Sequence, residues 1–272
     1  VAACLRGGAQ TPPQAWAYEA KSNLYAAPLT ADVHATPGKE VIIGDSEARR
    51  LRCISAAGTQ IWETDGARAW CWKKRLISAA ALSAPLADGT RLLAVGNGDG
   101  SLAALDAATG ELRWRAVPGA VEWGGGVWAD LDGDGAQEYV HAMTKDGVAA
   151  FDAQGNERWR YRGGEGGPKA EIAEVPAACD TDGDGRAEIF FTTPWGVHCL
   201  NGDGTARWET VTGDDFKASV IVGDADHDGV PELYTMSADD DYLWRMDART
   251  GAVAWKTPLA GGADVYNGSA LA

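Results

Sequence analysis

Short apolar segments alternate along the chain with turns rich in glycine and aspartate. Between residues 123 and 161, for example, the segments fall at about 123–129, 138–143, 147–152 and 156–161. Apolar segments of this length, bounded by such turns, are typical of β-strands, whereas helices need longer periodic segments. The pattern therefore predicts an all-β chain built from groups of four short strands.

A repeated element gives the period of these groups. The element Gly-x-x-x-Trp occurs five times, and its tryptophans are 45 to 52 residues apart. The copies are Gly58…Trp62, Gly110…Trp114, Gly155…Trp159, Gly204…Trp208 and Gly251…Trp255. Four-stranded units at this period, each with one aromatic residue, are the signature of a β-propeller. We predict one domain over residues 1–272 with five complete blades, at about 24–64, 76–116, 123–161, 171–210 and 216–257.

Glycine and tryptophan have separate roles in this element. The turn before each tryptophan needs a positive φ, which glycine adopts without steric cost. The tryptophan falls on the last strand of its blade, where we expect the ring to cover the gap to a neighbouring blade, because one unit cannot bury its faces alone.

Further strands are predicted on either side of the five blades. Trp16 fits the last strand of a preceding blade, and the segment around Tyr266 fits a first strand. We therefore expect residues 14–20 and 264–272 to be partial strands of a sixth blade, and the chain to be part of a larger chain or assembly.

Three acidic segments fit the pattern Asp-x-Asp-x-Asp-Gly-x-x-Glu, at residues 130–138, 180–188 and 224–232. Carboxylates at positions 1, 3 and 5 can converge on one cation when the chain coils tightly, and glycine at position 6 permits the coil. The carbonyl of position 7 and the acid at position 9 complete an oxygen-only shell, which suits Ca²⁺ better than Mg²⁺. Without a metal the clustered carboxylates would repel one another. We predict about three structural calcium ions.

The predicted ligands follow from this register. They are Asp130, Asp132, Asp134, Ala136 and Glu138 in the third blade, Asp180, Asp182, Asp184, Arg186 and Glu188 in the fourth, and Asp224, Asp226, Asp228, Val230 and Glu232 in the fifth. The first blade keeps only Asp32 and Glu40 of the four acids, and the second keeps none. We expect no metal in either, and expect His34 to be a polar turn residue.

These features resemble two kinds of repeat. The element Asp-x-x-Thr-Gly-x-x-x-Trp, as in Asp106 to Trp114, is similar to the repeat of quinoprotein-like (PQQ-type) propellers. The acidic loops resemble the FG-GAP/VCBS repeats of integrin-like calcium-binding propellers. Together the two resemblances cover residues 24–257, and they imply the fold more strongly than a function, since propellers have many unrelated functions.

Charge and composition narrow the function. The formal charge of −15 argues against binding to nucleic acid, whose phosphates such a surface repels. No apolar run approaches the roughly 20 residues of a membrane-spanning helix. The four histidines stand in no recognisable catalytic arrangement, and the five cysteines contain no Cys-x-x-Cys pair, which argues against a structural zinc site. We predict neither catalytic residues nor a bound organic cofactor, and we favour a protein that is not an enzyme.

A ligand face is expected opposite the acidic loops. Strands run up and down, so the acidic loops and the Gly-x-x-x-Trp turns share one face, and the remaining loops form the other. Aromatic, acidic and basic residues in these loops could contact sugar rings or a protein; they are Trp70, Trp72, Lys73, Trp123, Trp195, Asp240 and Tyr242. The alternative is that several of the aromatics pack between blades.

The sequence favours a calcium-stabilised recognition or adhesion module that is extracellular, on the cell surface or periplasmic and binds a glycan or a protein. One alternative is the propeller of a polysaccharide lyase or a related carbohydrate-active enzyme. A weaker alternative is a quinoprotein-like redox or assembly protein.

Overall fold

The structure is a computed structural model. It describes residues 16–19, 27–45, 50–64, 80–97, 100–119, 125–143, 146–163, 175–216, 218–238 and 241–259. Within these ranges the chain forms strands and turns, and no helix long and apolar enough to cross a membrane.

Twenty strands form five antiparallel sheets of four strands each. The first two sheets are β1 (Leu29–Ala31), β2 (Glu40–Asp45), β3 (Arg50–Ile54), β4 (Gln60–Glu63), and β5 (Ala81–Leu82), β6 (Leu92–Gly96), β7 (Leu102–Asp106), β8 (Leu112–Ala116). The next two are β9 (Gly126–Ala129), β10 (Glu138–Met143), β11 (Gly147–Phe151), β12 (Glu157–Tyr161), and β13 (Ala177–Cys179), β14 (Glu188–Thr193), β15 (Gly196–Leu200), β16 (Ala206–Val211). The fifth is β17 (Ile221–Gly223), β18 (Glu232–Met236), β19 (Tyr242–Asp247) and β20 (Val253–Pro258).

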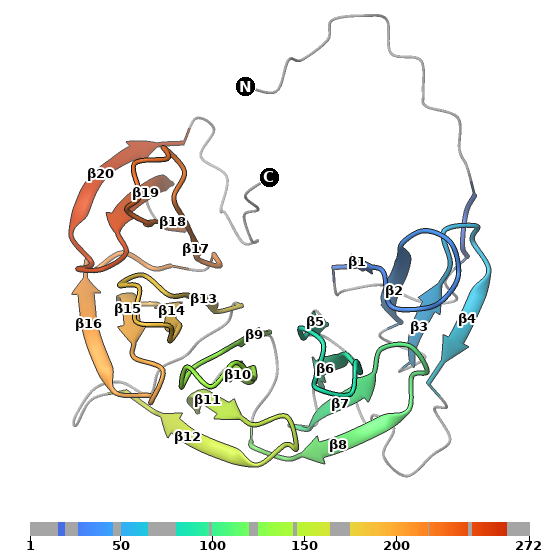
Figure 1. Cartoon of the computed structure of the whole chain (residues 1–272). Coiled ribbons are helices and arrows are strands. Elements are labelled where there is room, and N and C mark those ends of the chain that lie inside the picture. Colours follow the sequence, from blue (N-terminus) through green and yellow to red (C-terminus); the bar gives the residue numbers. More distant parts are fainter. Residues whose placement is uncertain are drawn as a thin grey trace, which may run out of the picture.

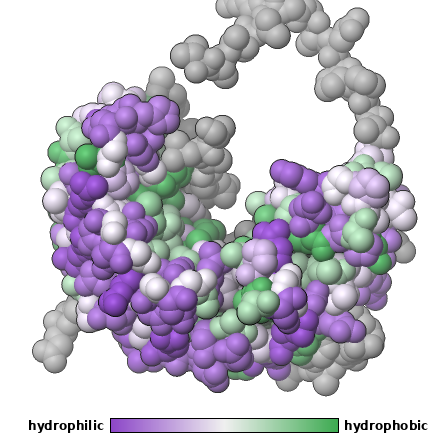
Figure 2. Space-filling view, viewed as in Figure 1, coloured by the Kyte–Doolittle hydropathy of each residue, from purple (hydrophilic) through white to green (hydrophobic). Residues whose placement is uncertain are grey.

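The five sheets are the blades of a propeller, as the repeat predicted. Each sheet keeps its strands in chain order, and the blades follow one another around an arc with β1, β5, β9, β13 and β17 innermost (Figure 1). The first and the last blade lie at the two ends of this arc. Hydrophilic residues cover much of its outer surface, and hydrophobic residues gather nearer its centre (Figure 2).

Side chains on both faces of the central strands are buried. Every residue of β10, β11, β14 and β15 is buried, because a blade lies against each face of the third and fourth sheets. On β10, Tyr139 and Met143 pack toward the second blade, whereas Val140 and Ala142 pack toward the fourth. Apolar side chains on both faces explain why these segments read as continuous apolar runs rather than as alternating ones.

The tryptophan of each of the first four repeats packs against the glycine of the next blade. A β-carbon added to Gly204 would lie 2.5 Å from the ring of Trp159, and the indole Nε1 of Trp159 donates to the carbonyl of Gly202 at 2.9 Å. The same approach joins Trp62 to Gly110, Trp114 to Gly155 and Trp208 to Gly251. The predicted role of the ring is confirmed. The glycines have a second role that was not predicted, because the absence of a side chain leaves room for the tryptophan ring of the preceding blade.

Trp16 makes the same contact with the first blade. Its indole Nε1 donates to the carbonyl of Ala56 at 2.8 Å, and its ring lies 2.8 Å from a β-carbon built on Gly58. The described residues 16–19 are not assigned as a strand, although the contact matches the one expected of a preceding blade. Residues 264–272 lie outside the described part of the chain.

The glycine contact predicts a stability difference between two alanine substitutions. Gly204 and Gly89 have nearly the same φ, +83° and +82°, but a β-carbon at Gly89 meets nothing within 4 Å. Gly89→Ala should cost about 1–2 kcal/mol, the penalty of the left-handed conformation alone. Gly204→Ala should cost a further ~1–3 kcal/mol, because the methyl group overlaps the ring of Trp159. Urea unfolding of both variants measures the difference in the free energy of unfolding. Equal losses of stability would mean that the blades accommodate the added methyl group without an energetic penalty.

Candidate metal centres

The three acidic loops occupy equivalent places in the third, fourth and fifth blades. In the fourth blade Asp180 directly follows the innermost strand β13, and Glu188 begins the second strand β14. The loop therefore turns the chain between these two strands, with its aspartates exposed and its closing glutamate buried. Strand pairing at both ends fixes the span of the loop.

The first aspartate holds the coil. The carboxylate of Asp180 accepts from the backbone N–H of Gly183 at 2.7 Å and of Gly185 at 2.9 Å. Asp130 holds the third-blade loop with two equivalent bonds. In the fifth blade His227 replaces the glycine at position 4 and adopts a φ of 62°, a conformation that costs a non-glycine residue energy. The predicted need for tight coiling is thus met in all three loops.

The closing glutamate closes the turn as well as offering an oxygen. Its Oε2 accepts from the backbone N–H at position 2 in each loop: Leu131 to Glu138 at 3.0 Å, Thr181 to Glu188 at 2.9 Å and Ala225 to Glu232 at 2.9 Å. Burial raises the pKa of Glu138, and the neighbouring carboxylate of Asp132 acts in the same direction. The first blade makes the same bond from Val33 to Glu40 without the aspartates. Sequence reasoning treated this residue only as a ligand and missed its structural role.

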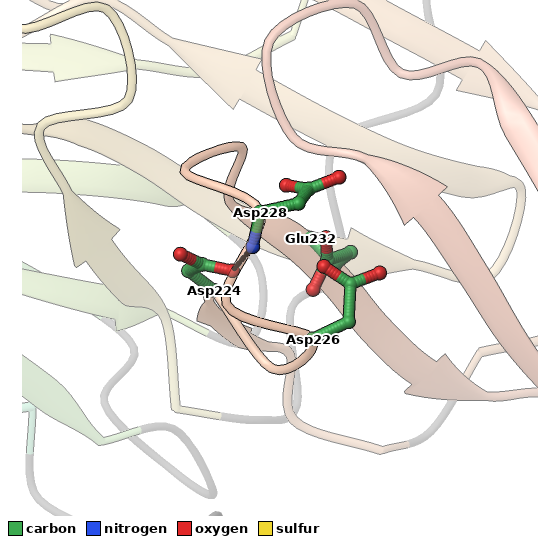
Figure 3. Close-up of side chains that lie close together, drawn as sticks. All are labelled: Asp224, Asp226, Asp228 and Glu232. Carbon is green, nitrogen blue, oxygen red and sulfur yellow. Dashed lines mark hydrogen bonds between the residues drawn. The ribbon is translucent and has the colours of Figure 1, made fainter.

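Each loop brings carboxylates close enough to hold one cation. In the fifth blade, oxygens of Asp224, Asp226, Asp228 and Glu232 lie within 4.8 Å of one another (Figure 3). In the other two loops the first and second aspartates and the closing glutamate are within that distance, which leaves out Asp134 and Asp184. Carboxylates supply only hard oxygen donors, which fit calcium, and these residues would hold it.

Asp134 and Asp184 are turned toward their own backbone. The carboxylate of Asp134 accepts from the N–H of Ala136, and that of Asp184 from the N–H of Arg186, both at 2.8 Å. Both aspartates thus remain in the loop, although neither belongs to the close group of oxygens. The ligand assignments at these positions and at the carbonyls of Ala136, Arg186 and Val230 remain predictions.

An arginine contacts two acids of each loop. Arg158 lies 2.7 Å from Asp132 and 3.6 Å from Glu138. Arg207 lies 2.9 Å from both Asp182 and Glu188, and Arg245 lies 2.7 Å from Asp226 and 3.0 Å from Glu232. The hydrogen bond from Arg207 lowers the pKa of Asp182. None of these three arginines was predicted from the sequence.

A polar groove of about 470 Å³ lies between the third-blade and fourth-blade loops. Its lining includes Asp132, Asp182, Arg158 and Arg207, together with Asn201 and Asp203 from the turn before Trp208. Acidic loops and Gly-x-x-x-Trp turns therefore meet on one face, as predicted.

The structure places only part of the predicted ligand face. Trp195 lies in the β14–β15 hairpin and is 53% exposed. Tyr242 begins β19, where the ammonium of Lys256 lies 4.4 Å from its ring centre. The other predicted face residues, Trp70, Trp72, Lys73, Trp123 and Asp240, lie outside the described residues.

Three of the four histidines pack or hydrogen bond within the fold. His141 is fully buried and 2.9 Å from the hydroxyl of Tyr139, and burial lowers its pKa to about 3. His198 stacks on Phe191 with ring centres 5.0 Å apart. His34 hydrogen bonds within its turn to Thr36, which agrees with its predicted role.

The family comparison identifies a repeat. The family model PQQ_2, described as outer membrane protein assembly factor BamB, matches residues 10–120 and 47–228. The quinoprotein-like part of the predicted resemblance is thereby confirmed, whereas the FG-GAP/VCBS part stays a prediction. No curated protein matches the sequence.

Three solved structures share the fold over 88–89% of this chain. They are the V. cholerae biofilm matrix protein Bap1, with 19% identity and a TM-score of 0.63, BamB from Moraxella catarrhalis, with 16% and 0.56, and the exotype rhamnogalacturonan lyase YesX, with 18% and 0.63. The matched part is 40% of the Bap1 chain, 64% of the BamB chain and 50% of the YesX chain. At these identities the likeness shows the fold alone.

The double role of the closing glutamate predicts a stability effect that needs no metal. Glu188→Ala, measured with a chelator present, should cost about 3 kcal/mol, because it leaves Arg207 and the N–H of Thr181 without their buried partner. Asp184→Ala is the matched control in the same loop and should cost about 0.5 kcal/mol or less, since its side chain is exposed. Chemical unfolding in EGTA measures both, and similar losses would contradict the structural role of Glu188.

Proposed function

The chain belongs to the PQQ-type repeat family described as outer membrane protein assembly factor BamB, and on this premise we propose that it is a calcium-stabilised recognition propeller. In this proposal three calcium ions fix one face of the arc, and a glycan or a protein binds the opposite face. The protein would act outside the cell, on its surface or in the periplasm.

The observation that carries the calcium assignment is the fifth-blade loop. Its four carboxylates offer oxygens within 4.8 Å of one another, and three of the four, those of Asp224, Asp228 and Glu232, accept hydrogen bonds from backbone N–H groups. The closing acid, Glu232, begins strand β18, which is the context expected of an FG-GAP/VCBS loop. Equivalent loops in two consecutive neighbouring blades support a structural rather than a catalytic metal.

Two observations support a recognition role. Trp195 exposes 53% of its surface in a hairpin on the face opposite the acidic loops, and exposed aromatic rings are common anchors for glycans and proteins. The two structural neighbours Bap1 and BamB are named as a biofilm matrix protein and as a member of an outer membrane assembly system. Both descriptions agree with a location outside the cytoplasm.

Calcium removal tests the first part of the proposal. Calcium at 100 times its Kd should stabilise the protein by about 2.7 kcal/mol for each occupied site, because it binds the folded loops only. We expect thermal melts of chelator-treated protein to shift upward with calcium and much less with magnesium, and metal analysis to find about three calcium ions per chain. Protein that retains no calcium and melts identically with and without it would contradict the assignment.

Trp195→Ala tests the second part. Binding of the variant to a glycan array and to an extract of extracellular matrix should fall at least about tenfold, the loss expected when an aromatic anchor is removed. Trp255→Ala is the matched control, because Trp255 is also exposed but lies on the outermost strand β20. Equal binding by the wild-type protein and both variants would remove Trp195 from the ligand face. Cleavage of acidic polysaccharides by the wild-type protein would favour the lyase alternative.

A further inference from the structure

The arginines of the acidic loops use oxygens that a bound calcium ion would need. One nitrogen of Arg207, Nη1, lies 2.9 Å from Asp182 Oδ2 and 2.9 Å from Glu188 Oε1. The other oxygen of Glu188, Oε2, already accepts from the N–H of Thr181. The guanidinium therefore contacts the oxygen of the closing glutamate that the turn itself leaves available.

The arginine that contacts the loop lies on the outermost strand in the third and fourth blades and on the adjacent strand in the fifth. Arg158 and Arg207 precede the blade tryptophan, where each outermost strand has a β-bulge. In the fifth blade the residue at the bulge is Ala254, and Arg245 reaches the loop from the adjacent strand β19 instead. Because the same pair of acids is contacted from two backbone positions, the contact is not a by-product of the repeat.

The blades without a complete acidic loop use these positions differently. In the first blade the bulge residue is Ile61, and Glu40 is held by the hydroxyl of Thr36 and by backbone N–H groups. In the second blade Arg113 occupies the bulge but pairs with Asp106 at 2.7 Å, outside any acidic loop. An arginine on the second aspartate and the closing glutamate thus accompanies each full set of acids.

We propose that Arg158, Arg207 and Arg245 are resident counter-ions of the calcium loops, which preform each loop without metal and compete with calcium for two of its carboxylates. This inference rests on the proposed calcium binding. A positive charge at close range offsets part of the repulsion among four carboxylates and opposes the entry of a divalent cation. The calcium affinity is therefore lower than the acids alone would give, in the range of about 10⁻⁴–10⁻³ M that is typical of extracellular calcium modules.

The test isolates one loop in the full chain. Asp130, Asp134, Asp224 and Asp228 are changed to Asn, which removes two carboxylates from each of the other loops but keeps the acids that pair with Arg158 and Arg245. Asparagine at positions 130 and 224 retains an acceptor for the loop N–H groups. Calcium titration by calorimetry then reports the fourth-blade loop alone.

In this background Arg207→Gln should lower the Kd for calcium about tenfold, because one unit charge beside the ion is removed. Arg113→Gln is the control for a change of net charge at the same bulge position, and its Kd should stay within about twofold of the background. In EGTA the Arg207→Gln protein should melt at a lower temperature than the Arg113→Gln protein, and saturating calcium should close that gap.

The outcomes separate the two levels of the proposal. An unchanged or weaker calcium affinity in Arg207→Gln would overturn the competition and would make Arg207 a residue that positions the acids. If neither the background protein, which keeps Arg207, nor its Arg207→Gln variant binds calcium at concentrations up to ~10 mM, the calcium assignment fails, and this inference fails with it. Arg245→Gln, in the equivalent background that leaves only the fifth-blade loop intact, repeats the test from another strand should Arg207→Gln fold poorly.

Discussion

The contact of each tryptophan ring with a glycine of the next blade determines how closely the blades pack. A β-carbon on any of the five glycines would come within 2.8 Å of that ring, so a larger residue would require the ring or the neighbouring backbone to shift. The same turns lie beside the acidic loops, since Gly202 accepts from Trp159 and lines the groove of the third and fourth loops. The position of one loop relative to the next therefore depends on how the blades are spaced.

The period and the element types could be predicted from the sequence because they depend on local chemistry. Glycine at a positive φ, a tryptophan at a fixed distance and a short apolar segment are visible within each repeat. The second role of the glycines was not visible, because Gly204 meets Trp159 only when two blades stack. Contacts between repeats are a property of the packed arc, and one repeat read alone does not contain them.

The candidate sites were predictable in position but less so in detail. The spacing of acids placed each loop between the first and second strands, and all three loops coil as expected. Asp134 and Asp184 fall outside the close group of oxygens, whereas Asp228 belongs to it. All three carboxylates accept from the backbone N–H two residues ahead, a preference common to aspartate in turns, so this bond does not account for the difference. A partial signal for the arginines exists, since Arg113, Arg158 and Arg207 all precede a tryptophan. That signal would have misplaced Arg113 and missed Arg245, because partner choice depends on which acids the fold brings near.

The loops are also connected to one another, which bears on what a metal in them would do. The N–H of Ala187 in the fourth-blade loop donates to the carbonyl of Asp130 in the third at 2.8 Å. The corresponding residue of the fifth-blade loop, Pro231, has no N–H to donate. There the side chain of Arg249 donates to the carbonyl of Thr181 at 2.6 Å and restores a link between the two blades.

These two hydrogen bonds connect the acidic loop of the fourth blade to that of the third blade and to Arg249 of the fifth. A cation that fixes the carboxylate of Asp130 would restrain a residue whose carbonyl is already bonded to the neighbouring loop. Restraint in one loop would then reduce the freedom that the next loop loses on binding a cation, which would favour binding at successive sites. Because the linked segments run over the third to fifth blades on one face, metal binding there would stiffen that face, whereas the exposed hairpin of Trp195 lies on the other.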